Sequence, residues 1–247
     1  MIAALGLPAG TMVDQRVPKK LLIENGAPTA ADRRQISNGI EEILWVAALK
    51  PATVGVPEFQ DNERAYIEIA VLRMTLRAAV TGRRLAALVH RAIPYPVLLV
   101  SAAEQETVMS VAHIRWSQSE AGKTVLDGDI VAVELEVESS AADASAFREA
   151  LWLARQPQAS LYMLYQGWLD TLVALQASRI TGRFRMLDSL QTAAARRGAL
   201  QEITQLEVRI ARLRSAAAAE TQIARRVEVN LEIRRLEAAR LSALGRL

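Results

Sequence analysis

The chain has 247 residues, of which 51% are hydrophobic, 23% charged and only 4% aromatic, and it contains no cysteine. This composition excludes a disordered or fibrous protein, and the lack of cysteine excludes disulfides, thiol catalysis and cysteine-ligated zinc. The formal net charge of +3 is too small to indicate a nucleic-acid partner by itself. No stretch resembles a membrane-spanning helix or a signal peptide, so we expect a soluble cytoplasmic protein.

The first half of the chain alternates between helical and strand patterns. We predict a helix over 27–49, where apolar residues recur at helical spacing before Pro51, and a short strand over 52–56. Alternating apolar residues predict further strands over 66–74, 96–101, 106–116 and 128–137, and an amphipathic helix is expected over 81–93. We expect the strands 96–101 and 106–116 to pair antiparallel. This order favours an α+β fold class, with an N-terminal mixed α/β sandwich over residues 1–138.

The pattern becomes entirely helical after that domain. Helices are predicted over 147–156 and 161–180 within a helical segment spanning 139–195. The last predicted domain, 196–247, is a coiled-coil helix, because Ala199–Leu244 contains neither glycine nor proline. As one helix this stretch would be about 70 Å long.

An apolar seam with the 3-4 spacing of a coiled coil follows this C-terminal helix. We expect it to comprise Ile203, Leu206, Ile210, Leu213, Ala217, Ala224, Val227 and Leu231. Glu220 interrupts the seam, and Ile233, Leu236 and Leu244 lie off it. So long a helix needs a cover, so we expect a homo-oligomer, another protein partner, or a return of the segment 147–190.

The C-terminal helix is also basic. From Arg196 onward the chain has eleven arginines and six glutamates, a net charge of +5 that exceeds that of the whole chain. Three basic pairs or clusters are candidates for contact with DNA or with a protein partner. They are Arg16, Lys19 and Lys20 around Pro18, then Arg83 and Arg84 at the start of a predicted helix, and Arg225 and Arg226. Because arginines alternate with glutamates, a solvated coiled-coil flank is the favoured interpretation of the last pair.

Catalytic and metal-binding patterns are weak. The AGKT stretch, 121–124, lacks the glycine that a phosphate-binding loop needs five residues before Gly122, so we predict a surface turn. Asp61 and Glu68 have the separation of a Mg²⁺-dependent nuclease pair, but the lysine expected after Glu68 is missing. His90 and His113 have no neighbouring carboxylate at ligand spacing, and we interpret both as partly buried, hydrogen-bonded histidines. We therefore expect no catalytic residue, metal or cofactor.

Three stretches resemble an uncharacterised bacterial family called domain of unknown function 4391. The first carries Asp14, Arg16, Val17, Pro18, Lys19, Lys20, Glu24, Ile40, Ile43, Trp45, Leu49, Pro51 and Thr53. The second is RAIPYPVLLV, 91–100, and the third is the coiled-coil signature over 202–241, in which Ala224 replaces the usual asparagine. The resemblance covers nearly the whole chain.

The resemblance implies a setting rather than a mechanism. Proteins of this kind look like companions of helicases and DNA methyltransferases in bacterial phage-defence or restriction islands. It favours a non-enzymatic accessory or adaptor subunit of a DNA-processing complex, assembled through the coiled coil. A divergent Mg²⁺-dependent nuclease and a stand-alone DNA-binding protein are the two alternatives.

Overall fold

A computed structural model describes residues 1–77, 82–104, 106–120, 122–135, 141–187 and 189–247. The chain divides into two compact units, Met1–Leu172 and Val173–Leu247. The expected domain boundary at 138/139 lies outside the described residues. Across the described ranges, no helix combines the length and the hydropathy needed to cross a membrane.

The first unit contains a six-stranded sheet, a small hairpin and several helices. The sheet strands are β1 (Met12–Arg16), β2 (Ile40–Leu49), β5 (Ile69–Leu76), β6 (Val97–Ala102), β7 (Thr107–Trp116) and β8 (Thr124–Glu134). The hairpin pairs β3 (Phe59–Gln60) with β4 (Ala65–Tyr66). The helices are α1 (Lys19–Gly26), α2 (Ala30–Gly39), α3 (Pro51–Val54), α4 (Gly82–Ala92) and α5 (Ala141–Ala150), and α6 (Leu161–Thr181) continues into the second unit.

The sheet is mixed, in the order β1-β2-β5-β6-β7-β8. Among the described strands of this sheet, only β5 and β6 run parallel, and the connection between them contains α4. The other neighbours are antiparallel, including the expected pair β6 and β7, in which Val97 lies opposite Ala112. The predicted α+β class with an N-terminal mixed sheet is therefore confirmed, as are the amphipathic helix now seen as α4 and the helix now seen as α6.

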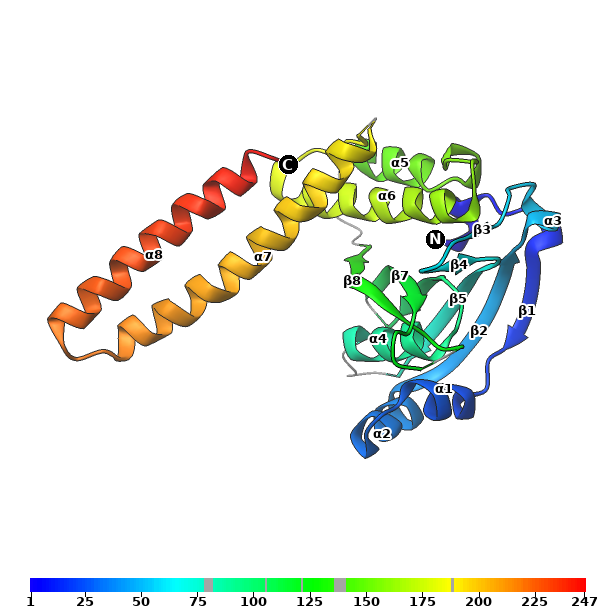
Figure 1. The fold of residues 1–247 in the computed structure, drawn as a ribbon, viewed down its shortest axis with the longest axis horizontal. Coiled ribbons are helices and arrows are strands. Elements are labelled where there is room, and N and C mark those ends of the chain that lie inside the picture. Colours follow the sequence, from blue (N-terminus) through cyan, green and yellow to red (C-terminus); the bar gives the residue numbers. More distant parts are fainter. Residues whose placement is uncertain (78–81, 105, 121, 136–140, 188) are drawn as a thin grey trace. The chain divides into compact units, whose positions relative to one another are not determined.

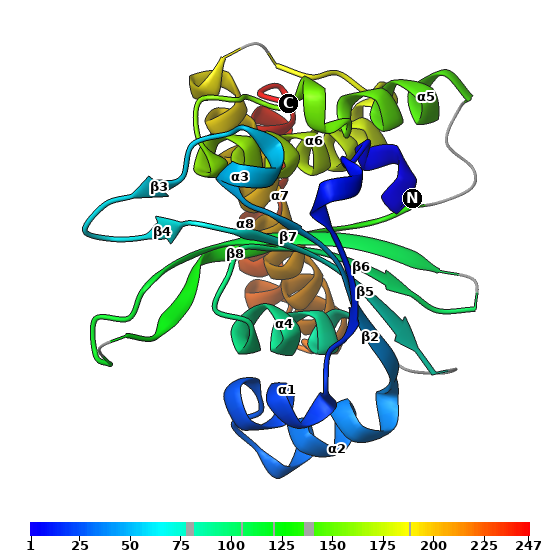
Figure 2. The same cartoon turned by 90° about the vertical axis from the view of Figure 1, so that its right-hand side faces the viewer.

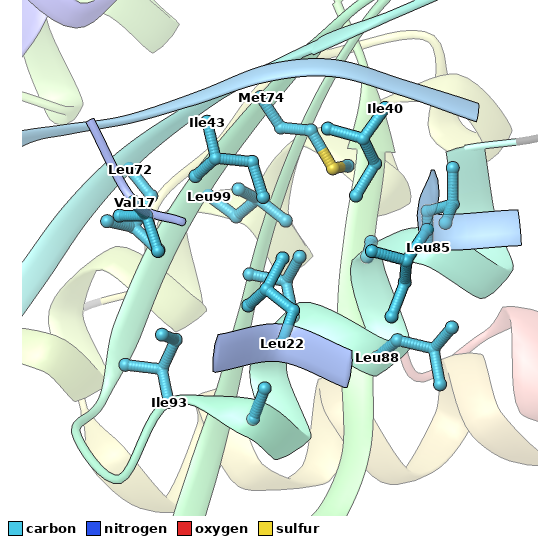
Figure 3. Close-up of a cluster of buried hydrophobic side chains, with 14 of the residues drawn as sticks. Val17, Leu22, Ile40, Ile43, Leu72, Met74, Leu85, Leu88, Ile93 and Leu99 are labelled. Atoms are coloured by element: carbon cyan, nitrogen blue, oxygen red, sulfur yellow. The ribbon is translucent and has the colours of Figure 1, made fainter. Parts of the chain in front are cut away.

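Three helices cover one face of the sheet. Figure 2 shows α4 next to the strands, with α1 and α2 beyond it. The core between them contains Leu22 of α1, Leu85 and Leu88 of α4, and Leu72 and Leu99 of the central strands, all fully buried (Figure 3). Helix α1 approaches α4 so closely that a Cβ on Gly26 would lie 2.6 Å from the carbonyl oxygen of Leu88. This contact requires a glycine.

The helix predicted over 27–49 is wrong in its second half. Helix α2 ends at Gly39, and the next ten residues form β2 between β1 and β5. The pairing of β2 with β5 is irregular between Ile40 and Glu42, so Ile40 and Ile43 both reach the same core. A β-bulge therefore produces the three-residue spacing that imitates a helix.

The strand predicted over 52–56 is also wrong. Pro51–Val54 forms one helical turn, α3, because Pro51 suits the first position of a helix and Thr53 closes the turn. The Thr53 hydroxyl accepts a hydrogen bond from the Lys50 backbone nitrogen at 3.0 Å. Gly55 then ends the turn with a φ of 69°, a left-handed conformation that favours glycine.

The long C-terminal helix is present but is not continuous. Helix α7 (Leu190–Ala219) and helix α8 (Ile223–Leu244) lie side by side as a helical hairpin (Figure 1). The single helix expected over 199–244 is thus corrected to two antiparallel helices, and the chain reverses over Glu220–Gln222. A Glu220 carboxylate oxygen accepts a hydrogen bond from the Gln222 backbone nitrogen at 2.8 Å, which stabilises the turn without glycine or proline.

Candidate interaction surfaces

The hairpin interface is a narrow apolar strip. Ile210 of α7 and Ile233 and Leu236 of α8 are 5–8% exposed and form its centre. Four exposed ion pairs join the two helices at 2.6–2.8 Å: Arg209–Glu232, Arg214–Glu237, Arg240–Glu207 and Arg246–Glu202. Such surface pairs contribute little stability each, at most about 1 kcal/mol. Their regular succession matches the antiparallel register.

The turn at Glu220–Gln222 divides the predicted coiled-coil seam between the two helices. The members on α7, Ile203, Leu206, Ile210, Leu213 and Ala217, are all buried or half-buried. The members on α8, Ala224, Val227 and Leu231, are exposed. The buried side chains of α8 are instead Ile233, Leu236 and Ala243, two of which were expected to lie off the seam. The break at Glu220–Gln222 reverses the chain, so the phase of α7 does not continue into α8.

Helix α8 consequently has a second apolar face, which we call the outer stripe. It consists of Ile223, Val227, Leu231 and Leu241, which are 71%, 52%, 50% and 71% exposed. The first three are spaced four residues apart, so they follow one side of the helix. Ile233 and Leu236 occupy the opposite side, against α7. An aligned set of large aliphatic side chains open to water is typical of an interaction site.

Unpaired arginines accompany the outer stripe. Arg226 is exposed beside the stripe and has no ion-pair partner among the described residues; Arg225 is exposed and unpaired there as well, but it lies two residues from both Ile223 and Val227 and so on the other side of α8. Arg234 is also exposed and lies one heptad after Val227, on the same side of α8. The glutamates that balance the other arginines are used in the pairs between α7 and α8. The outer stripe is therefore apolar with a basic border.

The basic turn around Pro18 is largely structural. Val17 is buried in the core, and its backbone nitrogen donates to the Ile43 carbonyl at 2.9 Å. The Lys19 ammonium donates to the carbonyls of Ser37, at 3.3 Å, and Ile40, and so satisfies groups left open at the end of α2. Burial, followed by the nearby Arg77 and Arg16, lowers the pKa of Lys19. The turn thus fastens α1 to the junction of α2 and β2.

Most of the other predicted contact residues in the first unit have acidic partners. Arg16 pairs with Glu42 at 3.0 Å, and Lys20 with Glu24 at 3.7 Å. Arg84 pairs with the buried Asp32 at 2.7 Å and so joins α4 to α2.

The Thr29 hydroxyl and the Arg84 guanidinium together lower the pKa of Asp32.

Arg83 is exposed without a partner among the described residues. The sequence predictions missed Arg33, Arg34 and Arg91, which are exposed in the same helical layer. The seven-residue spacing of Arg84 and Arg91 was a usable signal, because it places both on one side of a helix.

A buried polar network lies between α6 and the opposite face of the sheet. The Tyr66 hydroxyl contacts His113 Nδ1, and His113 Nε2 lies 2.9 Å from the Gln166 amide oxygen. Since an amide oxygen only accepts, Nε2 carries a proton, and the Tyr66 hydroxyl is placed to donate to Nδ1. Gln166 then donates to Asp170 at 3.0 Å. Burial raises the pKa of the Tyr66 phenol, which keeps it a hydrogen-bond donor. This network attaches α6 to β7.

The residues considered for catalysis have structural partners. His90 contacts the Ser110 hydroxyl at 3.0 Å, and burial lowers its pKa to about 4. Asp61 accepts hydrogen bonds from the backbone nitrogens of Glu63 and Arg64, at 2.8 and 2.7 Å, and shapes the turn between β3 and β4. Glu68 pairs with Lys50 at 3.1 Å.

Neither a metal cluster nor a phosphate loop is formed by the residues that the structure covers. No group of three histidines, aspartates or glutamates among them is placed to hold a metal ion. Ala121 of the AGKT stretch lies outside the described residues. Gly122 and Lys123 lie between β7 and β8, where the backbone nitrogen of Lys123 donates to the Glu120 carbonyl at 3.3 Å. These described residues form the expected surface turn.

Comparison with known proteins gives a family without an assigned activity. Neither a curated protein nor a solved structure matches the chain significantly. One family, described as a domain of unknown function, matches residues 5–239 and therefore covers β1 through most of α8. Both the basic turn around Pro18 and the outer stripe up to Leu231 fall within this range. The chain belongs to the DUF4391 family.

Proposed function

We propose that the protein is a non-enzymatic accessory subunit that joins a partner protein through the outer stripe of α8. The setting suggested by its family resemblance is a bacterial phage-defence complex that processes DNA, with a helicase or methyltransferase as the partner. The observation that carries the proposal is the exposure of Ile223, Val227 and Leu231 along one side of a helix whose other side is already packed.

The outer stripe offers enough apolar surface to contribute to binding. Full burial of an aliphatic side chain contributes about 1.5–3 kcal/mol, and the four members retain half or more of their exposure. Covering all four therefore releases on the order of 4 kcal/mol before the entropic cost of association is subtracted. This suits one partner helix that lies along α8.

The charges around the outer stripe favour an acidic partner. Arg226 and Arg234 flank the stripe and are exposed without carboxylate partners among the described residues, so a helix with glutamates beside its apolar face would neutralise them. Two copies of the hairpin would instead bring two basic surfaces together, because residues 196–247 carry a net charge of +5. We therefore propose an acidic amphipathic helix of another protein as the occupant.

Site-specific photo-crosslinking in the native host tests this function. A photoreactive residue at position 227 should join the chain to one partner through an acidic helical segment. The same residue in place of Val208, which is 48% exposed on α7, should not. Equal crosslinking from the two positions would contradict the proposal.

Reconstitution supplies the quantitative test. The purified partner should bind the wild-type chain, and Val227→Glu with Leu231→Glu should weaken that binding by at least about 100-fold, because two charges enter an apolar contact. Val208→Glu is the matched control and should leave the dissociation constant unchanged. If light scattering shows instead a homodimer that the double variant dissociates, a second copy is the occupant and the proposed partner class is wrong.

A further inference from the structure

Charge in the first unit is strongly segregated. Residues 1–172 carry 16 cationic and 20 anionic side chains. Ten of the cations but only four of the carboxylates lie in the segments 16–42 and 69–103. The second of these segments has five arginines and no carboxylate. These segments contain the helices α1, α2 and α4, which form the layer on one face of the sheet (Figure 2).

Four arginines of this layer are not used by the fold. Arg33 and Arg34 on α2 and Arg83 and Arg91 on α4 are exposed, and none has a carboxylate partner among the described residues. Their neighbour Arg84 differs, because it is held by the buried Asp32. We call the four arginines the basic layer.

The arrangement of the two helices is fixed by that ion pair. Arg84 contacts Asp32 through two nitrogens, at 2.7 and 2.9 Å, so α2 and α4 are held together next to Arg33 and Arg83. Arg83 and Arg91 flank Ala87 on the side of α4 opposite the buried Leu85 and Val89. Eight residues of helix place their Cα atoms about 12 Å apart, close to the width of the major groove of DNA.

We propose that the basic layer binds the phosphate backbone of double-stranded nucleic acid. Guanidinium groups suit this ligand because their fork geometry matches phosphate oxygens. The layer has no exposed aromatic side chain in residues 16–42 and 82–94, so it lacks the stacking platform that single strands require. Within residues 16–42 and 82–94 the only large exposed apolar residue is Leu21, at 36%, which disfavours insertion into a membrane. This binding is independent of the partner that covers α8.

Fluorescence anisotropy of the full chain with a 20-base-pair DNA or RNA duplex tests the inference. With about four phosphate contacts, the logarithm of affinity should fall with the logarithm of salt concentration with a slope of about −3.6. Combining Arg33→Gln, Arg83→Gln and Arg91→Gln should weaken binding at least about 30-fold and bring the slope close to −1. These substitutions are exposed, so the melting temperature should not change.

A matched variant separates local contact from net charge. Arg225→Gln, Arg226→Gln and Arg234→Gln remove the same charge from the second unit and should leave duplex affinity within about twofold. Equal losses in the two variants would assign binding to overall charge and overturn the inference. Undetectable duplex binding at low salt, stronger binding to oligo(dT) than to duplex, or binding to anionic phosphatidylserine vesicles alone would also overturn it.

Discussion

The hydroxyl of Tyr165 on α6 is inserted between β6 and β7, where it accepts a hydrogen bond from the backbone nitrogen of Ala112 at 2.8 Å. It also lies within donating distance of the carbonyls of Val97 and Ala112, at 2.7 and 3.0 Å. One phenolic oxygen thus connects a helix with two adjacent strands. The side chain is fully buried, and burial raises its pKa well above the ordinary value for tyrosine. The hydroxyl therefore stays protonated at neutral pH.

Removing that hydroxyl should destabilise the first unit. Tyr165→Phe leaves a buried backbone nitrogen without its partner, so the free energy of unfolding should fall by about 1–3 kcal/mol. Urea denaturation followed by circular dichroism measures the change. Tyr162→Phe is the control, because Tyr162 is only half-buried, and it should change the free energy by less than about 0.5 kcal/mol. A loss from Tyr165→Phe as small as that from Tyr162→Phe would show that ring packing, rather than the hydroxyl, holds α6.

The two faces of α8 should respond differently to truncation. Leu236→Ala removes a side chain that is 8% exposed, so the hairpin should lose about 2–4 kcal/mol. Leu231→Ala removes a side chain that is 50% exposed and should cost less than about 0.5 kcal/mol. Hydrogen exchange of amides in α7 and α8 distinguishes the two variants. Greater loss of protection in Leu231→Ala would mean that the outer stripe is covered within the chain.

His90 should make the protein less stable at mildly acidic pH. Its pKa is about 4 in the folded protein because it is buried, against about 6.5 when unfolded. Below pH 6.5 the unfolded state binds a proton that the folded state does not, so stability is lost as pH falls towards 4 and is fully present above 6.5. The loss for this one group is about 3 kcal/mol.

The measurement compares wild type with His90→Gln, which cannot titrate. Unfolding free energies determined by urea at pH 7 and pH 4.5 should differ more in the wild type than in the variant. The variant should be less stable than wild type at pH 7, because its contact with Ser110 changes, and the gap should narrow in acid. Parallel pH profiles for the two proteins would show that His90 titrates normally in the fold.

Lys19 and Lys20 should contribute unequally although they are adjacent. Lys19→Met removes a charged donor from two carbonyls, so we expect a loss of about 1–2 kcal/mol in unfolding free energy. Lys20→Met removes only an exposed pair with Glu24 and should have an effect below about 0.5 kcal/mol. Thermal unfolding measured for both variants makes the comparison. An equal effect would assign both lysines to the solvated surface.

The sequence predicted those elements whose periodicity is undisturbed. Helix α4 has a regular apolar side, and β6 and β7 have short apolar runs on either side of a turn, so all three were predicted correctly. The β2 strand was misread because the irregular pairing near Glu41 replaces a two-residue spacing by a three-residue one. Local spacing alone cannot separate a bulged strand from a helix.

Local sequence spacing also predicted the interaction surfaces only in part. The seam was located correctly on α7, where Ile203 and Ile210 are buried. On α8 it was not, because the turn contains only Glu220, Thr221 and Gln222, none of which is a helix breaker. Glu220, a charged residue within the apolar seam, was the single local sign in the sequence of a break between the two helices. Arg84 forms an ion pair with Asp32, whereas Arg83 has no such partner among the residues that the structure describes. This difference depends on the position of Asp32, which is 52 residues away from Arg84 and cannot be read from the sequence.

The absence of glycine and proline from the turn at Glu220–Gln222 has a mechanical consequence. None of those three residues prevents helical backbone, so the bend persists mainly through the contacts between the two arms, and the hydrogen bond from Gln222 to Glu220 adds a local contribution. Conditions that separate the arms would let the segment straighten. Its reach would then grow from about 45 Å to about 80 Å, and apolar side chains now enclosed would line one uninterrupted rod.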